Sequence, residues 1–173
     1  MTLFRLATLN LENLDCAANR PEAFARRAAA LRPLLARLDA DILCLQEIDA
    51  QKAHKHSPRA YLALDHLLED TPYAGFHRAL SLRPGAEEPA DVHNLAILSR
   101  WPIAAQRQLH HDIVQPWDWP PPRDGDLQPP PIAIRWDRPL LYASITPPAG
   151  PNIHIVNLHP VSYTHLRAHE TRE

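Results

Sequence analysis

The sequence predicts a layered α/β domain with mixed β-sheets, and three observations predict it. Apolar, β-favouring runs open the chain and follow the first helical pattern, two amphipathic helical patterns precede Tyr73, and only strand patterns follow it. Strand, helix, strand, helix and then a run of strands is the order expected of a layered α/β fold. The 173 residues, 45% of them hydrophobic, match the size and apolar content of one domain.

The predicted elements follow one another along the whole chain. In order they are residues 2–11 (strand), 19–38 (helix), 41–46 (strand), 57–70 (helix) and the strands 73–80, 94–100, 103–111, 131–136, 140–147 and 152–159. Both helices are assigned from apolar side chains three or four positions apart. In the first helix we expect Asn19 to act as the cap, Pro21 to lie in the first turn, and Pro33 to kink or divide the helix.

The strands differ in how much of their surface they are expected to bury. The run 41–46 is short and continuously apolar, which predicts a strand buried on both faces, and Cys44 within it is expected to be a small buried hydrophobe. Proline is dense over residues 115–131, so this segment cannot pair as a central strand. We expect an exposed loop or lid there, carrying Trp117 and Trp119.

Composition excludes several classes of protein. Lys and Arg number 18 against 20 Asp and Glu, which gives no basic field for non-specific binding to long nucleic acid. The N-terminus has no apolar run that would serve as a signal peptide, and no stretch is long enough for a transmembrane segment. A cytoplasmic protein is therefore expected. Two cysteines provide no disulfide framework and no cysteine metal site.

Three polar residues stand at the ends of three predicted strands. Asn10 ends the first, Glu47 follows the apolar run 41–46, and His159 ends the last. Layered folds gather side chains at strand ends into one site, and a carboxylate, an amide and an imidazole suit metal-assisted hydrolysis. Taken singly, each has an ordinary alternative: a solvated edge residue, a turn former and a surface histidine.

The segments around these residues resemble a known family. "LATLNLENL", "DADILCLQEID", "NLAILSRWPI" and "IHIVNLH", in this order, are similar to the N-terminal half of the endonuclease/exonuclease/phosphatase family, whose members are DNase I-like in fold. The resemblance implies a four-layer sandwich of two mixed β-sheets flanked by helices, here truncated. It assigns residues 1–160 to the N-terminal part of that domain.

The resemblance also implies roles for individual residues. Glu47 corresponds to the metal-binding glutamate, and Asn10 to the asparagine that positions metal and phosphate and takes part in catalysis. His159 corresponds to the catalytic histidine at the scissile phosphate, and Arg138 to a phosphate-contacting arginine, although a surface arginine is about as probable there. The implied cofactor is Mg²⁺, with Mn²⁺ as the alternative.

One position departs from the family pattern. Asn94 occupies a place often held by glycine, and asparagine tolerates a left-handed backbone better than other residues. We expect the turn to survive and Asn94, together with His93, to face the cleft and bind substrate.

The second half of the family pattern is missing. No "G-D-x-N" segment and no terminal "D-H" pair occurs, so the chain carries about half of an active site and is expected to be inactive alone. Uncovered sheet edges also make stable isolated folding doubtful. Residues 161–173 resemble one reading frame of a transposon-end adapter used for sequencing libraries, so this tail is expected to be non-native, with Pro160 as the junction.

Three functions are compatible with these observations. The first is a full-length Mg²⁺-dependent phosphoester hydrolase, in which a metal-activated water attacks phosphorus. The second is a non-catalytic binding fragment that retains part of the cleft. The third is a small metal-binding protein built on His159, His165 and His169, which requires a genuine tail. The expected partner is a phosphoester substrate, either nucleic acid or a phosphorylated small molecule or lipid headgroup, with no stable protein partner.

Overall fold

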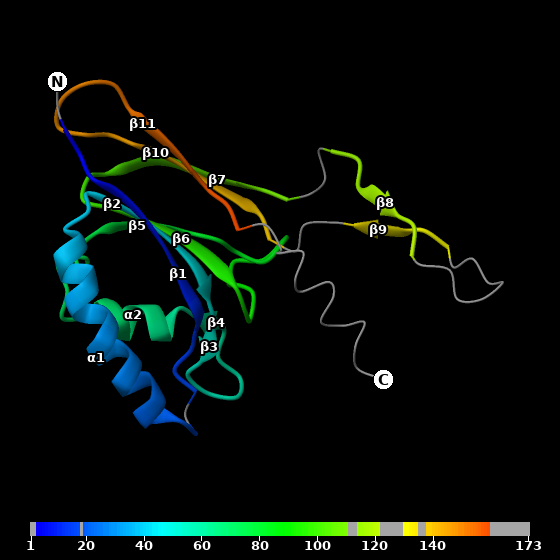
Figure 1. Cartoon of the computed structure of the whole chain (residues 1–173), viewed down its shortest axis with the longest axis horizontal. Coiled ribbons are helices and arrows are strands. Elements are labelled where there is room, and N and C mark those ends of the chain that lie inside the picture. The colour runs from blue at the N-terminus through cyan, green and yellow to red at the C-terminus, as the bar shows by residue number, and fades with distance from the viewer. Residues whose placement is uncertain (1–2, 18, 111–113, 122–129, 135–137, 160–173) are drawn as a thin grey trace.

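A computed structural model describes residues 3–17, 19–110, 114–121, 130–134 and 138–159 of the chain. Helices and strands alternate over the first part, and strands alone follow (Figure 1). The elements are β1 (Leu6–Leu14), α1 (Pro21–Leu38), β2 (Ile42–Ile48), β3 (Gln51–Lys52), β4 (Arg59–Ala60), α2 (Leu62–Leu68), β5 (His77–Leu80), β6 (Asn94–Ser99), β7 (Ile103–Leu109), β8 (Trp117–Trp119), β9 (Ile132–Ile134), β10 (Leu140–Ile145) and β11 (Ile153–Asn157).

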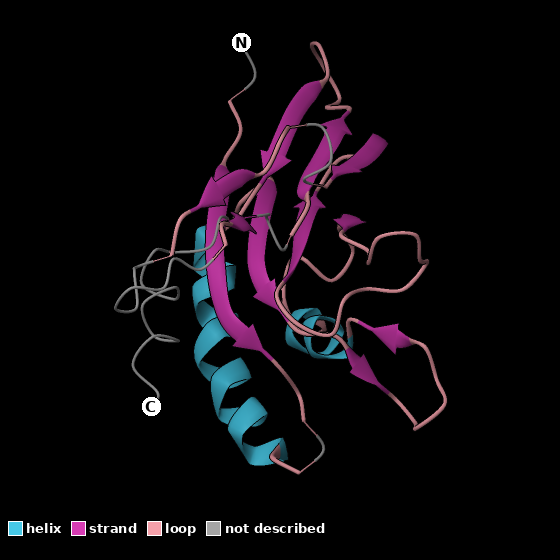
Figure 2. Cartoon of the chain, turned by 90° about the vertical axis from the view of Figure 1, so that its right-hand side faces the viewer, coloured by secondary structure: helices cyan, strands magenta, loops and turns pink. Residues whose placement is uncertain are grey.

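Two sheets form the centre of the molecule. The first has the order β1-β2-β6-β5, with β1 parallel to β2 and the other pairs antiparallel, and the second has the antiparallel order β11-β10-β7. Figures 1 and 2 show α1 and α2 on one side of the first sheet and the second sheet on its other side. The layered α/β class is confirmed. Three of the four expected layers are present in the described part of the chain.

Strand β2 is buried on both faces because it lies between the helices and the second sheet. Successive side chains of a strand point to opposite faces. Leu43 and Leu45 belong to the core cluster that includes both helices, whereas Ile42 and Cys44 belong to the cluster between the sheets. The predictions of a doubly buried strand and of a buried Cys44 are confirmed.

Helix α1 is continuous through Pro33. Of the two expected effects of Pro33, division of the helix is therefore wrong, and a kink stays a prediction. Pro33 and Ala29 are both exposed, so the carbonyl that loses its hydrogen bond faces water and the cost is reduced. Pro21 begins the helix as predicted, but the capping position is Arg20 and not Asn19, and no side chain caps it.

Helix α2 is shorter than predicted because residues at the start of the predicted helix form a strand instead. Arg59 and Ala60 form β4 against β3 in place of continuing the helix toward residue 57. The Oε1 of Gln51 then accepts a hydrogen bond from the Ala63 N–H at 3.0 Å, which satisfies a donor at the start of α2. A residue eleven positions before the helix therefore supplies its first hydrogen bond.

The proline-rich segment forms a small antiparallel ribbon where described. Trp117 pairs with Ile134 and Trp119 with Ile132, and the ribbon projects away from the two main sheets (Figure 1). Residues 122–129 of this predicted loop lie outside the described part. The exclusion of a central strand here is consistent with the ribbon's separation from both main sheets.

The edge strands β1 and β11, and the residue after β11, expose apolar side chains. Leu6 on β1, Val156 on β11 and Leu158 are each about half exposed. Within the described residues, β1 and β11 each pair on one side only. None of the helices there has both the length and the apolar character of a membrane span.

Tyr73 links the helical layer to the start of β2 and provides a stability prediction. Its ring is fully buried, and its hydroxyl oxygen accepts the Ala40 N–H at 2.9 Å. Tyr73→Phe leaves that buried N–H without a partner, so the free energy of unfolding is expected to fall by about 1–3 kcal/mol in urea denaturation. Tyr142→Phe is the matched control, because the Tyr142 hydroxyl contacts the exposed His154. An equal fall in the free energy of unfolding for both variants would contradict a stabilising role of the Tyr73 hydroxyl.

Candidate active site

Asn10, Glu47 and His159 come together at one end of the two sheets. The Nδ2 of Asn10 donates to the Oε1 of Glu47 at 2.9 Å, and the Nε2 of His159 lies 3.1 Å from the same oxygen. The side chains of Glu47 and His159 are mostly buried, with 17% and 22% exposed. The parallel pairing of β1 with β2 places Asn10 beside Gln46, next to Glu47. The three residues therefore converge as expected, but not all at strand ends: β1 continues past Asn10 to Leu14, Glu47 is the penultimate residue of β2, and His159 follows β11.

The backbone is irregular at Glu47, near the C-terminal end of β2. The β2–β6 register shifts between Leu45 and Ile48, and Glu47 has a left-handed φ of 57°. A bulge of this kind re-aims a side chain that the regular pleat would send elsewhere. Left-handed φ values of 47° and 55° occur at Glu12 and Asn13 on the adjacent end of β1. Such conformations cost free energy and persist only where surrounding contacts hold them.

Arg27 of α1 holds the irregular end of β1. Its guanidinium donates to the carbonyl oxygens of Leu11, Glu12 and Asn13, at 2.7 Å for Glu12 and 3.2 Å for Asn13. The Oδ1 of Asn10 accepts the Glu12 N–H at 2.7 Å. These bonds fix the Asn10 amide, which in turn faces the Glu47 carboxylate.

Burial and nearby donors act in opposite directions on Glu47. Burial raises the pKa of its carboxyl group, but the hydrogen bond from Asn10, the charges of His159 and His93 and the Asn13 N–H together outweigh burial and lower it. Glu47 is therefore an ionised carboxylate at neutral pH. An ionised carboxylate oxygen is the ligand that a hard cation such as Mg²⁺ prefers.

The lowered pKa of Glu47 predicts a pH dependence of stability. A carboxyl group with a folded pKa below its unfolded value stabilises the fold above the unfolded pKa, and this contribution is lost as pH falls through the folded pKa. Between about pH 6 and about pH 3, the free energy of unfolding measured in urea is expected to fall less for Glu47→Gln than for the wild type. An identical fall in both proteins would contradict the lowered pKa. Glu22→Gln, which removes an exposed carboxylate in the first turn of α1, is the control.

His93 and Arg138 adjoin this centre. The His93 N–H donates to the Oδ1 of Asp49 at 3.0 Å, and an Arg138 N–H donates to the Nδ1 of His93. Burial and the Arg138 charge lower the pKa of His93, against the opposing charges of Asp49 and Glu47. Arginine has no acceptor, so Nδ1 of His93 is unprotonated and its proton is on Nε2.

Asn94 lies below the surface of the site. It is buried, and its amide donates at 2.9 Å to the carbonyl oxygens of Ile48 and Ala90 and accepts the Ala90 N–H at 3.0 Å. The left-handed residue of this turn is His93, with φ of 59°, and Asn94 is in β6, so the expectation of a left-handed Asn94 is wrong. Both N–H groups of its amide are engaged within the chain, and Asn94 ties the His93 turn to β2 beside Glu47. Direct substrate binding by Asn94 stays a prediction.

Asn157 and Gln46 form a buried support that the sequence analysis did not identify. The Nδ2 of Asn157 donates to the carbonyl oxygens of Leu45 and Ala96 at 2.9 and 3.0 Å, and its Oδ1 accepts from the Nε2 of Gln46 at 2.7 Å. The Gln46 amide also donates to the Thr8 hydroxyl at 3.0 Å. Because Gln46 precedes Glu47 and Asn157 lies two positions before His159, this network joins the sheets at the site. The sequence signal that could have identified them is a polar side chain inside an apolar run, because a buried polar group needs a hydrogen-bond partner.

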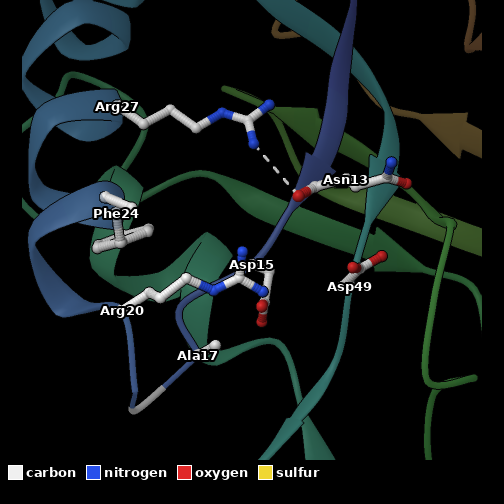
Figure 3. Close-up of a pocket in the computed structure, with 8 residues that line it drawn as sticks. Asn13, Asp15, Ala17, Arg20, Phe24, Arg27 and Asp49 are labelled. Carbon is white, nitrogen blue, oxygen red and sulfur yellow. Dashed lines mark hydrogen bonds between the residues drawn. The ribbon is translucent and has the colours of Figure 1, made fainter.

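A cavity of about 320 Å³ lies between the first turns of α1 and the C-terminal ends of β1 and β2 (Figure 3). Asn13 and Asp49 contribute from the ends of β1 and β2, and Phe24 and Arg27 from α1. In Figure 3, Arg20 and Arg27 extend from the start of α1 toward the strand ends. Burial, aided by the charges of Asp15 and Asp91, raises the pKa of Asp49. The cavity therefore mixes both charges with one aromatic ring.

The donor atoms of this centre suit Mg²⁺ in kind. Glu47 offers carboxylate oxygens, and Mg²⁺ needs only one or two protein carboxylates because it keeps several waters. In the described residues no three His, Cys, Asp or Glu side chains lie close enough to hold a metal ion together. The Oδ1 of Asn10 is engaged with the Glu12 N–H, so Asn10 orients Glu47 in this arrangement, and its direct ligation of a metal stays a prediction. His165 and His169 lie outside the described residues.

Comparisons with known proteins identify the family and the fold of the chain. Residues 7–169 match the sequence model of the Endonuclease/Exonuclease/phosphatase family. A solved endonuclease/exonuclease/phosphatase family protein from Leptotrichia buccalis C-1013-b superposes with a TM-score of 0.55 at 15% sequence identity, covering 99% of this chain and 64% of that chain. The chain thus spans less than two thirds of that protein. No curated protein matches.

Proposed function

The chain belongs to the endonuclease/exonuclease/phosphatase family, a family of hydrolases, and from this premise we propose that the whole protein is a Mg²⁺-dependent phosphoester hydrolase. A water molecule attacks phosphorus and the P–O bond breaks. The observation that carries the proposal is the contact of Glu47 with both Asn10 and His159, because three separate strands deliver a carboxylate, an amide and an imidazole to one point. Mn²⁺ is the alternative cation.

Each residue has a role in this proposal. Glu47, ionised at neutral pH, holds the cation, and Asn10 keeps the carboxylate oriented through its amide. His159 contacts the scissile phosphate and assists proton transfer, while Arg138 binds phosphate oxygens through its guanidinium. When bound, Mg²⁺ offsets phosphate charge and lowers the pKa of a coordinated water.

The 173-residue chain by itself is proposed to have little or no activity. Residues that act as one catalytic unit lose orders of magnitude in rate when part of the unit is missing. The sequence contains neither the "G-D-x-N" segment nor the terminal "D-H" pair of the family pattern. Efficient Mg²⁺-dependent hydrolysis by the purified chain would contradict this.

Hydrolysis of generic phosphoesters tests the proposal. The protein encoded by the full reading frame, obtained by sequencing the parent locus past His159, is assayed with bis(p-nitrophenyl) phosphate and p-nitrophenyl phosphate. We expect turnover with Mg²⁺ or Mn²⁺, and its loss in EDTA. Absence of metal-dependent turnover on both substrates, with the protein folded, would reject the function.

One observation favours the alternative of a non-catalytic binding chain. In the described residues Glu47 and His159 form the centre without a third potential metal-binding carboxylate, imidazole or thiolate. Such a chain would retain phosphoester binding while hydrolysing nothing. Binding of a non-hydrolysable phosphorothioate by a full-length protein that shows no turnover would favour this alternative.

The substrate and its setting complete the proposal. The net charge of −2 favours a phosphorylated small molecule or lipid headgroup over long duplex DNA. The protein is proposed to act in the cytoplasm without a stable protein partner.

A further inference from the structure

The pairing of β1 with β2 becomes irregular next to the Glu47 centre, and Arg27 of α1 binds the backbone there. The two strands pair regularly from Leu6 to Asn10, and the register then shifts before Leu14. The carbonyl oxygens of residues 11, 12 and 13, which lie in this interval, all accept hydrogen bonds from the Arg27 guanidinium. Backbone carbonyl groups that leave a regular ladder need other donors. Helix α1 therefore supplies donors where the ladder is irregular.

The backbone of the same interval directs two N–H groups toward Asn10 and Glu47. Glu12 and Asn13 have left-handed φ values of 47° and 55°. The Glu12 N–H donates to the Oδ1 of Asn10 at 2.7 Å, and the Asn13 N–H donates to the Glu47 carboxylate. A left-handed backbone is unfavourable for residues other than glycine and persists only where contacts hold it. The direction of both N–H groups therefore depends on the bonds that Arg27 makes to the adjacent carbonyl oxygens.

These contacts require the shape of an arginine side chain. The planar guanidinium carries five N–H donors in a fixed fork, which is enough for three carbonyl oxygens at once, whereas lysine donates from a single nitrogen atom. The Arg27 side chain is half-buried and borders the cavity of about 320 Å³ at the start of α1. Its neighbour Arg26 is exposed and lies 3.9 Å from Glu22 on the same helix. Arg26 therefore provides a matched comparison for Arg27.

We propose that Arg27 is a positioning residue of the Glu47 centre: by holding the left-handed turn, it orients Asn10 and Glu47 for cation binding and hydrolysis. In this role Arg27 contacts neither the cation nor the substrate. The inference rests on the proposed function for the chemistry at Glu47, while the effect of Arg27 on the turn is independent of that function. A substitution confined to α1 should therefore reach the site through the backbone of β1.

Amide hydrogen exchange in the 173-residue chain, without metal, tests the effect on the turn. We expect Arg27→Lys to speed exchange of the Glu12 and Asn13 N–H groups about tenfold, because the left-handed turn opens more often. Exchange of the Leu43 N–H, in the middle of β2, reports any global loss of stability. Acceleration at Glu12 and Asn13 beyond that at Leu43 is the expected result.

Binding of Mn²⁺ to the same chain tests the effect on the centre. Arg27→Ala should weaken Mn²⁺ binding about tenfold or more, as is usual when a residue that orients a metal ligand is removed, and Arg27→Lys should weaken it less. Added guanidinium ion, far below the concentrations that unfold proteins, should restore part of the affinity of Arg27→Ala, because the cavity gives it access to the vacated position. The same ion should restore nothing in Glu47→Gln.

Two controls separate positioning from general stability. Arg26→Ala removes an exposed guanidinium one position earlier and should change neither the exchange rates nor the Mn²⁺ affinity. Tyr73→Phe weakens the fold at the start of β2 and should leave the Mn²⁺ affinity of the folded protein unchanged. Two results would overturn the inference. One is exchange at Glu12 and Asn13 that accelerates no more than at Leu43 in folded Arg27→Lys and Arg27→Ala, and the other is equal Mn²⁺ affinity in the wild type and in Arg27→Ala.

Kinetics of the full-length protein distinguish failure of this inference from failure of the proposed function. Arg27→Lys should lower kcat about tenfold with little change in KM, because Arg27 does not contact the substrate. An unchanged kcat in Arg27→Ala rejects the inference and leaves the proposed function intact. A folded wild type that neither binds Mn²⁺ nor hydrolyses phosphoesters rejects the function, and faster exchange at Glu12 and Asn13 in Arg27→Lys then still supports the role of Arg27 in holding the turn.

Discussion

Asn157→Leu is expected to lower the free energy of unfolding by about 3–5 kcal/mol, as measured by urea denaturation. The substitution removes three buried hydrogen bonds that join β11 to β2 and β6. It leaves the carbonyl oxygens of Leu45 and Ala96 without these donors, at the place where the β2–β6 register shifts. A buried polar group that loses its partner bears its full desolvation cost, and leucine cannot supply a donor.

Asn152→Ala is the matched control for this prediction. Asn152 is exposed just before β11, and its amide donates to the Ser144 hydroxyl at 3.2 Å. Its change in stability should stay within about 0.5 kcal/mol, as is usual for surface substitutions. If Asn157→Leu were as stable as this control, the buried amide would not hold the two sheets together.

Glu47→Gln is expected to reduce hydrolysis by the full-length protein at least about 100-fold. The substitution keeps the size of the side chain and removes the carboxylate charge, which the cation requires. In the 173-residue chain the same change should weaken Mn²⁺ binding at least about tenfold, as measured by water proton relaxation. The two measurements separate loss of metal from loss of catalysis.

Two further variants serve as controls for this prediction. Glu69→Gln, directly after α2, removes an exposed carboxylate near His66 and should leave rate and Mn²⁺ affinity unchanged. Glu47→Asp keeps the charge on a shorter side chain and should retain more Mn²⁺ affinity than Glu47→Gln. Unchanged Mn²⁺ affinity in folded Glu47→Gln would show that the cation binds elsewhere.

Arg138 shows how far a sequence resemblance can place a residue. The resemblance gave it a phosphate-contacting role, and the structure brings it into contact with His93 beside the Glu47 centre. For its partner, His93, the sequence indicated only that the side chain could face the cleft. The pairing depends on a left-handed turn at His93, whose N–H is held by Asp49 directly after β2. Local sequence does not fix that turn, because a left-handed backbone is uncommon in any non-glycine residue, even though histidine adopts it more often than most.

The succession of the main strands and the two helices was determined by the sequence alone. Apolar periodicity is a local property, so it located β1, β2 and β11, although β1 continues past Asn10 to Leu14 and β2 includes Glu47. The tertiary structure alone decided how these residues are held. The Asn157 amide reaches carbonyl oxygens 112 and 61 positions away, and the irregularity at Glu47 arises from the pairing of β2 with both β6 and β1. Contacts between distant segments cannot be derived from local periodicity, because their geometry is set when the sheets pack.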